Sequence, residues 1–188
     1  VRDDDGATAS VSQLVSVNET VVNEPPDAWF SYQPGSPTDV QDVVFNASAS
    51  SDSDGSIVNY SWSYGDGGVG YGAAVMHRFA VDGSYTVSLT VRDDDGASDT
   101  ISRSVVVANV APSADFSVVA DGLRVDFTDL SGDVDGDVVN WTWSFGDGMV
   151  SFEPDPSYRY GASGSYSVEL VVRDDDGATA SVSQLVSV

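Results

Sequence analysis

The sequence contains no cysteine and no lysine, and both absences limit what the chain can be. Without cysteine it has no disulfide framework, no thiol nucleophile and no thiolate ligand for a metal. No apolar run approaches the ~18 residues that a membrane-spanning helix needs, so we expect no direct membrane span. No signal peptide opens the sequence, which begins in the middle of a motif at Val1. We therefore interpret the chain as a fragment of a longer protein.

Positive charge is scarce. The chain has 7 basic residues, all of them arginine, against 30 acidic residues, and its formal net charge is −23. Such a surface repels nucleic acid and anionic membranes, so neither is an expected partner. It attracts cations and repels itself in dilute salt. Two interpretations remain open: a protein of a high-salt organism, such as a halophilic archaeon, or an ordinary acidic secreted protein with many calcium sites.

An internal repeat sets the domain organisation. Residues 1–17 and 172–188 carry the same letters, VRDDDGATASVSQLVSV, and a related run starts at Val91. The run WSYGDG at 62–67 returns as WSFGDG at 143–148, so the shorter offset is 143 − 62 = 81 residues. Such self-similarity is typical of repeat arrays. We predict that 1–17 is the C-terminal hairpin of a preceding repeat, 18–24 a linker, 25–108 domain 1 and 109–188 domain 2.

The hydrophobic pattern has a period of two, which is typical of β-strands. Tyr85, Val87, Leu89 and Val91 alternate with serine and threonine, and clusters of Gly, Asp and Ser separate such runs. No window shows a helical stripe. The pattern predicts an all-β fold of two antiparallel sandwiches. A Trp on a central strand and a Tyr that opens a late strand are typical of immunoglobulin-like cores, and the expected core residues are Trp62, Tyr85, Trp143 and Tyr166.

Two motifs carry a family resemblance. The runs at 62–67 and 143–148 resemble the WDFGDG hallmark of PKD domains, although Ser63 and Ser144 stand where that family often has Asp. The pattern GSYxVxLxVxDxxG, which begins at Gly83 and Gly164, is similar to its second hallmark. The resemblance covers roughly 23–188. It implies two tandem immunoglobulin-like (PKD) β-sandwich domains, preceded by the terminal strands of a previous repeat, in a protein that works at the cell surface.

Acidic side chains recur at equivalent places in the two domains. In PKD-like modules that bind calcium, an Asn before the domain, an Asp-rich loop before the Trp strand and an Asp of the late hairpin converge. The resemblance therefore implies calcium ligands among Asn23, Asp52, Asp54, Asp93, Asn109, Asp133, Asp135 and Asp174. An EF-hand is excluded, because position 12 of each loop is serine rather than the bidentate Glu. The competing interpretation is that these are solvated turn residues.

Catalysis is not expected. The single histidine is His77, and the 81-residue offset places Tyr158 at the equivalent position of domain 2. An essential general base would not be replaced by tyrosine in a sister copy. The many carboxylates do not alter this expectation, since 30 acids must form some close pairs. We therefore predict that the chain is not an enzyme.

Other surface features point to an extracellular protein. Four N-glycosylation sequons begin at Asn18, Asn46, Asn59 and Asn140, although the abundance of serine and threonine makes chance matches a competing explanation. Asn59 and Asn140 are equivalent and are expected to face outward. Trp29, Tyr71, Trp141 and Phe152 are candidates either for a carbohydrate platform or for packing against a neighbour. We expect Trp141 to be exposed or to lie at an interface.

Two functions fit these patterns. The first is a structural segment of an extracellular stalk, filament or surface layer that mediates spacing, adhesion or assembly. Its partners would be neighbouring PKD repeats in the same chain or filament, together with cell-surface proteins or glycans. Short linkers that contain Pro25, Pro26 and Pro112 favour this function, because proline stiffens a joint. The second is a carbohydrate-binding accessory module of a secreted hydrolase, which would need a distinctive exposed aromatic strip.

The charge imbalance predicts a salt-dependent stability. With a chelator present throughout, the unfolding temperature should be lower at ~0.1 M than at ~1 M potassium chloride, because carboxylates repel one another over ~10 Å in the first case and ~3 Å in the second. Circular dichroism at increasing temperature measures this difference. Equal unfolding temperatures at the two salt concentrations would contradict the high-salt interpretation.

Overall fold

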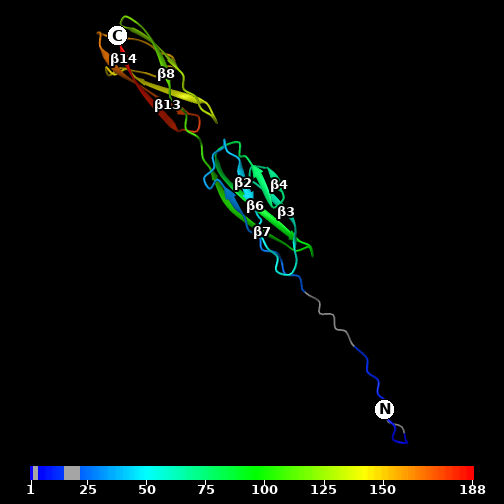
Figure 1. Ribbon diagram of the computed structural model, residues 1–188. Coiled ribbons are helices and arrows are strands. Elements are labelled where there is room, and N and C mark those ends of the chain that lie inside the picture. Colours follow the sequence, from blue (N-terminus) through cyan, green and yellow to red (C-terminus); the bar gives the residue numbers. More distant parts are fainter. Residues whose placement is uncertain (2–3, 15–21) are drawn as a thin grey trace.

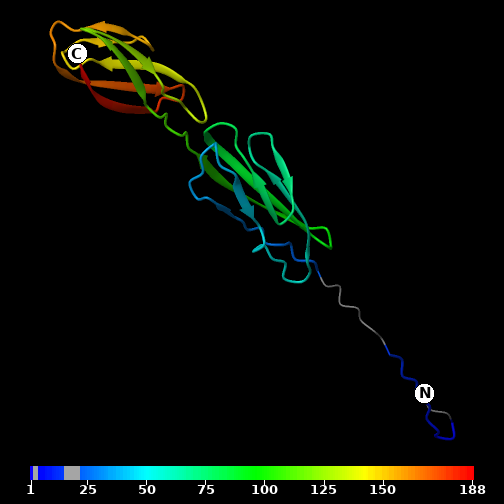
Figure 2. The same cartoon turned by 45° about the horizontal axis from the view of Figure 1, so that its top comes forward.

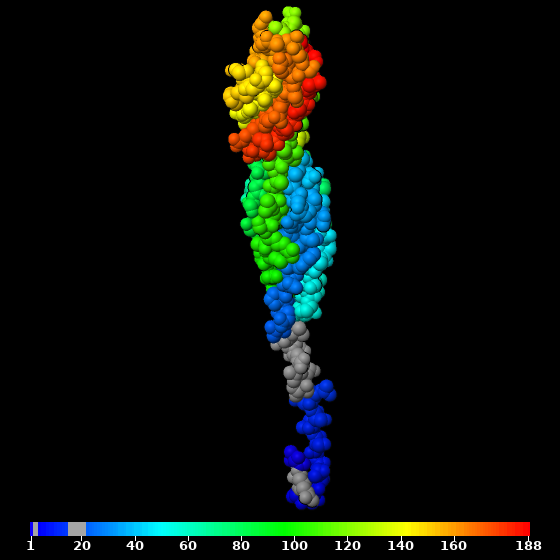
Figure 3. Space-filling model, turned by 90° about the vertical axis from the view of Figure 1, so that its left-hand side faces the viewer, coloured from blue at the N-terminus to red at the C-terminus, as the bar shows by residue number. Residues whose placement is uncertain are grey.

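The computed structural model describes residues 1, 4–14 and 22–188, and its main feature is a pair of β-sandwiches arranged end to end (Figure 1, Figure 3). All regular elements in the described residues are strands, seven in each sandwich. The all-β prediction with two tandem sandwiches is therefore confirmed. None of the described residues forms a helix long and apolar enough to cross a membrane.

Domain 1 consists of two antiparallel sheets. The four-stranded sheet has the order β4 (Val69–Tyr71), β3 (Ile57–Ser63), β6 (Gly83–Asp93) and β7 (Ser98–Val107). The three-stranded sheet has the order β1 (Ser31–Gln33), β2 (Val43–Asn46) and β5 (Ala74–His77). The long β6–β7 hairpin pairs from Gly83↔Val107 to Arg92↔Ser98, and it ends at the first Asp-Asp-Asp-Gly turn.

Domain 2 repeats this topology. Its four-stranded sheet has the order β11 (Val150–Ser151), β10 (Val138–Ser144), β13 (Ser165–Asp174) and β14 (Thr179–Ser187). Its three-stranded sheet has the order β12 (Ser157–Arg159), β9 (Arg124–Asp129) and β8 (Phe116–Asp121). The register is also repeated, since Trp62 lies opposite Leu89 and Trp143 lies opposite Leu170.

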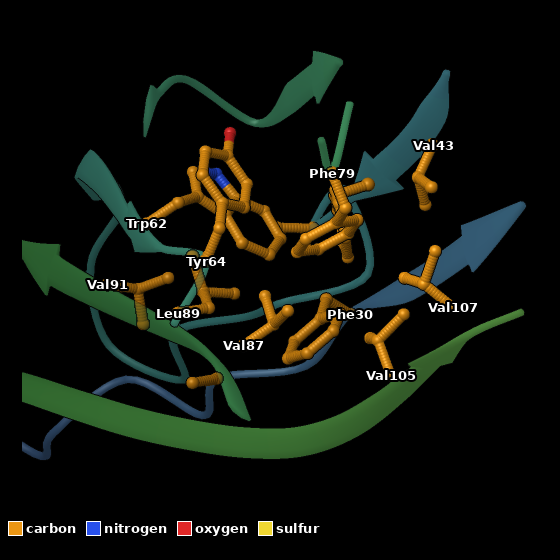
Figure 4. Packing of buried hydrophobic residues seen from close by; sticks show 13 residues of the cluster. Phe30, Val43, Trp62, Tyr64, Phe79, Val87, Leu89, Val91, Val105 and Val107 are labelled. Carbon is orange, nitrogen blue, oxygen red and sulfur yellow. The ribbon is translucent and has the colours of Figure 1, made fainter. Parts of the chain in front are cut away.

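The core of each domain lies between its two sheets and is rich in aromatic rings; Figure 4 shows the core of domain 1. Trp62 and Trp143, the expected core tryptophans, are 2% and 0% exposed. Trp62 packs edge-on against Phe30 at 5.1 Å between ring centroids, and its indole N–H donates to the carbonyl oxygen of Gly72 at 2.9 Å. The polar atom of each buried indole needs such a partner, and Trp143 donates to a carbonyl oxygen in the same way.

The two expected core tyrosines, Tyr85 and Tyr166, are packed against the buried clusters of their domains. Tyr85 is half-buried, stacks on Phe79 at 4.3 Å, and donates its hydroxyl hydrogen to the carbonyl oxygen of Val81 at 2.7 Å. Tyr166 makes the same kinds of contact in domain 2. Leu89 is the β6 residue opposite Trp62. Four residues of strand, about 13 Å, therefore separate Tyr85 from it. Such a hydrogen bond to upstream backbone is typical of a tyrosine corner.

The first glycine of each GDG run has a backbone conformation that side chains disfavour. Gly65 and Gly146 have φ angles of +88° and +83°. A Cβ atom on Gly65 would lie 2.8 Å from the carbonyl oxygen of Thr86, and one on Gly146 would lie 2.6 Å from that of Ser167. Any other residue would therefore be strained and would also push against the neighbouring strand. This is why the turn after each Trp strand begins with glycine.

The repeated segment at the N-terminus has the same closing backbone pair as its copy in domain 2. Val1 and Ala9 exchange backbone hydrogen bonds of 3.1 and 3.2 Å, and the equivalent residues Val172 and Ala180 are paired in the β13–β14 hairpin. Beyond this turn, residues 10–14 form no strand, and Leu14 is fully exposed. The rest of the predicted hairpin, residues 2–3 and 15–17, lies outside the described residues.

Candidate calcium-binding loops and the domain joint

In domain 1, the linker, the Asp-rich loop and the late hairpin meet at one end of the sandwich. The side-chain nitrogen of Asn23 donates to Asp93 Oδ2 at 3.0 Å. The next backbone N–H, that of Glu24, donates to Asp54 Oδ2 at 3.1 Å. Asp52 Oδ1 and Oδ2 are buried and have no hydrogen-bond partner. The structure therefore brings together the four residues of domain 1 that the family resemblance selected.

Domain 2 repeats these contacts. The side-chain nitrogen of Asn109 donates to Asp174 Oδ2 at 2.9 Å, and the backbone N–H of Val110 donates to Asp135 Oδ2 at 2.7 Å. Asn109 Oδ1, Asp133 Oδ1 and Asp135 Oδ1 are buried without a hydrogen-bond partner. Buried oxygens normally accept hydrogen bonds, so these three are exceptions. As in domain 1, four oxygen-bearing side chains meet where the linker enters the domain.

The two hairpin aspartates, Asp93 and Asp174, hold the linker and the hairpin turn together through hydrogen bonds. Asp93 is 1% exposed, and its Oδ1 accepts hydrogen bonds from the backbone N–H groups of Gly96 at 2.5 Å and Ala97 at 2.8 Å. Burial raises the pKa of Asp93, but the hydrogen bonds from Asn23, Gly96 and Ala97 outweigh it and hold the pKa below its ordinary value. Asp174 accepts from Ala178 N–H at 2.7 Å in the same way. These carboxylates fix the linker to the hairpin turn.

The Asp-rich loops, by contrast, place carboxylates against each other. Burial, followed by the closeness and negative charge of the Asp54 carboxylate, raises the pKa of Asp52 above its ordinary value. Burial and then the facing Asp135 do the same to Asp133. Unpartnered carboxylate oxygens that face one another fit a hard cation, because calcium binds 6–8 oxygen atoms from carboxylates, amides, backbone and water.

The protein ligands available to such a cation are of mixed type. Within residues 1, 4–14 and 22–188, no group of three or more His, Cys, Asp or Glu side chains is arranged to hold a metal ion. A calcium ion at either loop would therefore depend on the pair of loop aspartates together with the asparagine amide oxygen, backbone carbonyls and water. Calcium accepts this mixture of ligands.

One further acid, which the sequence motifs did not reveal, lies at the joint between the domains. Asp39, in the loop between β1 and β2, is 6% exposed, and its Oδ1 has no hydrogen-bond partner. Its carboxyl group lies within hydrogen-bonding reach of Asp135 in domain 2. Burial, and then the contact with Asp135, raises the pKa of Asp39 above its ordinary value.

His77 has a structural environment. Its ring stacks on Tyr64 at 3.9 Å, and Nε2 lies 2.6 Å from Asp66 Oδ2. In domain 2, Tyr158 stacks on Phe145 at 4.1 Å and donates to Asp147 Oδ2 at 2.7 Å. The hydrogen bond to Asp147 and burial raise the pKa of Tyr158 to about 12. The phenol therefore stays protonated at neutral pH. His77 and Tyr158 thus have the same structural role, which we call bracing: each ring stacks on an aromatic side chain and is bonded to an aspartate.

The sequon asparagines differ in what the structure reveals about them. Asn59 on β3 and Asn140 on β10 are exposed, and each lies on the strand that carries the core tryptophan. Asn46 is exposed at the end of β2, where its Oδ1 accepts the backbone N–H of Ser48 at 2.8 Å. Asn18 lies outside the described residues.

The aromatic candidates do not form one platform. Tyr71 and the equivalent Phe152 are 73% and 67% exposed, one in each domain. The guanidinium of Arg103 lies 5.3 Å from the ring centre of Trp29. Trp141 is half-buried, packs on the core of domain 2 and donates to Asp129 Oδ2 at 2.7 Å. Our expectation for Trp141 was wrong, because residues two apart on a strand point to the same face, here the face of Trp143.

Comparison with known families decides the identity of the fold. The family described as "PKD domain" matches residues 23–108 and 109–188. The chain belongs to the PKD domain family. The resemblance in the motifs is thereby confirmed, and the two sandwiches are tandem PKD domains.

The relatives of these PKD domains include large proteases. The chain is 35% identical over 141 residues to "Pre-pro-metalloprotease PrtV" of Vibrio cholerae serotype O1, a match to 74% of this chain and 15% of that protein. It is 36% identical over 85 residues to "Collagenase ColQ1" of Bacillus cereus (strain Q1), covering 43% and 9%. The chain thus spans 15% or less of the length of these relatives.

Among solved structures, the chain is similar to the PKD1 domain of Vibrio anguillarum Epp. The identity is 42%, the match covers 43% of this chain and 96% of that one, and the TM-score is 0.43. The PKD1 domain of the Vibrio cholerae metalloprotease PrtV matches with 40% identity, coverage of 42% and 98%, and a TM-score of 0.41.

The shared environment of His77 and Tyr158 predicts that one residue can replace the other. The His77→Tyr variant should retain its unfolding free energy to within ~1.5 kcal/mol, because ring stacking and the bond to Asp66 both persist. The His77→Ala variant should lose ~1–3 kcal/mol, since stacking is lost and Asp66 is left without that partner. Urea unfolding of the full chain measures both values. Equal damage from the two substitutions would contradict a purely bracing role.

Proposed function

We propose that the chain is a non-catalytic spacer segment of a longer secreted protein, in which the PKD domains hold other parts at a set distance. The observation that carries this proposal is that three successive residues of the linker between the domains are bonded to the domains on either side. Ala108 pairs with the β1–β2 loop, Asn109 bonds to Asp174, and the N–H of Val110 bonds to Asp135. A linker fixed in this way keeps the two domains in one relative orientation, whereas a flexible Gly/Ser linker would not.

Calcium forms part of the proposed function. In domain 1 the ion would be held by Asn23, Asp52 and Asp54, with Asp93 behind them holding the linker to the hairpin turn. In domain 2 the corresponding residues are Asn109, Asp133, Asp135 and Asp174. When bound, the ion supplies positive charge that cancels the repulsion between facing carboxylates. Because both sites include a linker residue, binding would stiffen the place where the chain enters each domain.

The proposed location is outside the cell. The matched relatives are named as a pre-pro-metalloprotease and as collagenases. PKD domains in such proteins favour a secreted parent for this chain, and the acidic surface suits a saline or calcium-rich environment. The exposed sequons at Asn46, Asn59 and Asn140 are available for glycosylation in that environment.

An accessory module that binds a polysaccharide is the second candidate function. It is favoured by the exposed aromatic at the same place in each domain, Tyr71 and Phe152. A flat, exposed ring is the usual contact for an extended ligand. Each domain presents only a single ring at this place, whereas the tied linker involves both domains, so we place the spacer first.

Small-angle X-ray scattering of the full chain tests the spacer. In millimolar calcium the pair-distance distribution should show one peak for a single domain and a second feature at the spacing of the two domain centres, because the joint is fixed. A distribution without the second feature would contradict the spacer. Retention on an insoluble polysaccharide that is lost in Tyr71→Ala or Phe152→Ala would favour the second candidate.

Calcium should stabilise both domains. At about 100 times the dissociation constant, binding adds ~2.7 kcal/mol to the unfolding free energy, which for a domain of this size raises the unfolding temperature by roughly 10–20 °C. Calorimetry with chelator and with calcium, both at high potassium chloride, measures the shift. Asp52→Asn should reduce the shift of one domain and Asp133→Asn that of the other, while the exposed Asp42→Asn serves as a control. No shift in the unaltered chain would refute the calcium sites.

A further inference from the structure

The loop between β1 and β2 distinguishes domain 1 from domain 2. The core residues Phe30 and Phe45 are 15 positions apart, whereas their counterparts Phe116 and Phe127 are 11 apart, so the segment between the two core residues is four residues longer in domain 1 (45 − 30 = 15; 127 − 116 = 11). The loop between the strands themselves is 34–42 in domain 1, against 122–123 between β8 and β9. This blue loop lies at the end of domain 1 that faces domain 2 (Figure 2). The additional residues therefore extend domain 1 toward the joint.

Backbone contacts hold this loop against the linker. The N–H of Ala108 donates to the carbonyl oxygen of Pro37 at 2.9 Å, and Thr38 and Ala108 form a parallel β-bridge. Arg78 Nε donates to the carbonyl oxygen of Asp39 at 3.0 Å. The backbone of Asp39 is thus held by the Thr38–Ala108 bridge before it and by the Arg78 side chain, and neither contact uses the Asp39 carboxylate.

One oxygen of the buried Asp39 carboxylate, Oδ1, has no hydrogen-bond partner. The residue is 6% exposed, and its carboxylate faces Asp135. Asp135 uses Oδ2 to accept the N–H of Val110 and keeps a buried Oδ1 without a partner, as does Asp133. Two ionised carboxylates cannot donate to each other, so their contact needs either a cation or a shared proton.

The charges around this contact add to the need for a cation. The negatively charged Asp82 of domain 1 lies near enough to Asp39 to repel its carboxylate. Asp176 of domain 2 is repelled in the same way by Asp82 and by Asp135. Arg78 donates to a carbonyl oxygen, and in the described part of the chain Asp39 forms no ion pair with it or with any other basic side chain. The joint therefore gathers negative charge from both domains, and Arg78, the basic residue bonded to this loop, contacts a backbone carbonyl rather than a carboxylate.

We propose that Asp39 supplies a carboxylate ligand from domain 1 to the calcium ion of domain 2, so that a single ion ties the two PKD domains together. The inference rests on the proposed calcium sites and adds a ligand from the neighbouring domain to one of them. The other ligands would be Asn109, Asp133 and Asp135. Because the three carboxylates are not already grouped to hold a metal in the described residues, binding would have to draw them together around the ion. The short turn between β8 and β9 has no residue equivalent to Asp39, so the long loop makes this joint a feature of domain 1 followed by domain 2.

Binding measurements on the full chain test the ligand. By isothermal titration with calcium chloride, the unaltered chain should bind two ions. Asp39→Asn should weaken one of these sites about tenfold, since calcium affinity follows the number of charged ligands, and should leave the other site unchanged. Asp42→Asn is the matched control, because it removes the same charge from an exposed position in the same loop.

Stability gives a second readout, with opposite signs in the two conditions. In chelator, Asp39→Asn should raise the unfolding temperature of the chain, because a buried repulsion between carboxylates is relieved. In calcium it should lower that temperature, because a ligand is lost. A purely structural role of the side chain would lower the temperature in both conditions, and Asp39→Ser provides the same comparison should the asparagine variant fail to fold.

The coupling between the domains can be measured by spin labels. The chain has no cysteine, so labels at Val58→Cys and at the equivalent Val139→Cys, which are both exposed positions, report one distance between the domains. Calcium should narrow the distance distribution in the unaltered and Asp42→Asn backgrounds but not in Asp39→Asn.

The outcomes separate this inference from the calcium proposal. If the unaltered chain binds no calcium, the calcium proposal fails and this inference fails with it. If it binds two ions and Asp39→Asn behaves like Asp42→Asn, only the bridging role is overturned. A distance distribution that is equally narrow in chelator and in calcium would also overturn it, because protein contacts or a shared proton would then hold the joint.

Discussion

The hydrogen bonds to Asp93 and Asp174 are the interaction on which the rest of the arrangement depends. Each carboxylate is almost completely buried and accepts hydrogen bonds from a hairpin turn and from the linker asparagine. A buried carboxylate is costly unless such bonds compensate it, so the linker residue and the turn are held together. The linker thereby becomes part of the domain that follows it, and the Asp-rich loop lies beside it.

This arrangement concentrates negative charge at the places where domains meet. The loop carboxylates of domain 2 and Asp39 are held close to one another by the Thr38–Ala108 bridge, by the bond from Arg78 Nε to the carbonyl oxygen of Asp39, and by the bond from the N–H of Val110 to Asp135 Oδ2. The fold thus places negative charges next to one another, and the proposed calcium ion would reduce the cost of their repulsion. Salt screens exposed charges well but buried pairs poorly, so general salinity and a bound divalent ion would act on different parts of the same acidic surface.

The 81-residue offset is enough to predict most of the fold and the repeated part of the candidate site. Period-two runs locate the long strands, and duplicated Asp-rich turns locate the loops, because both are local patterns present in two copies. Asp39 could not be found in this way, since its loop has no counterpart in domain 2. Its partner, Asp135, is 96 positions away (135 − 39), and no local pattern reports such a contact. Trp141 was misplaced because the alternation of side chains along its strand was applied wrongly: it lies two residues from Trp143 and therefore points to the same face.

The outer faces of the long hairpins are built very differently from the charged ends. Across β6 and β7, hydroxyl groups pair between Ser84 and Ser104, Ser88 and Ser102, and Thr90 and Thr100, at 2.8 to 3.0 Å. On this face Arg92 is the only charged residue among those of β6. A molecule with a net charge of −23 thus carries a nearly neutral flank. Two such molecules that lie side by side would meet little electrostatic repulsion along these flanks, so lateral bundling is opposed far less than contact between their ends.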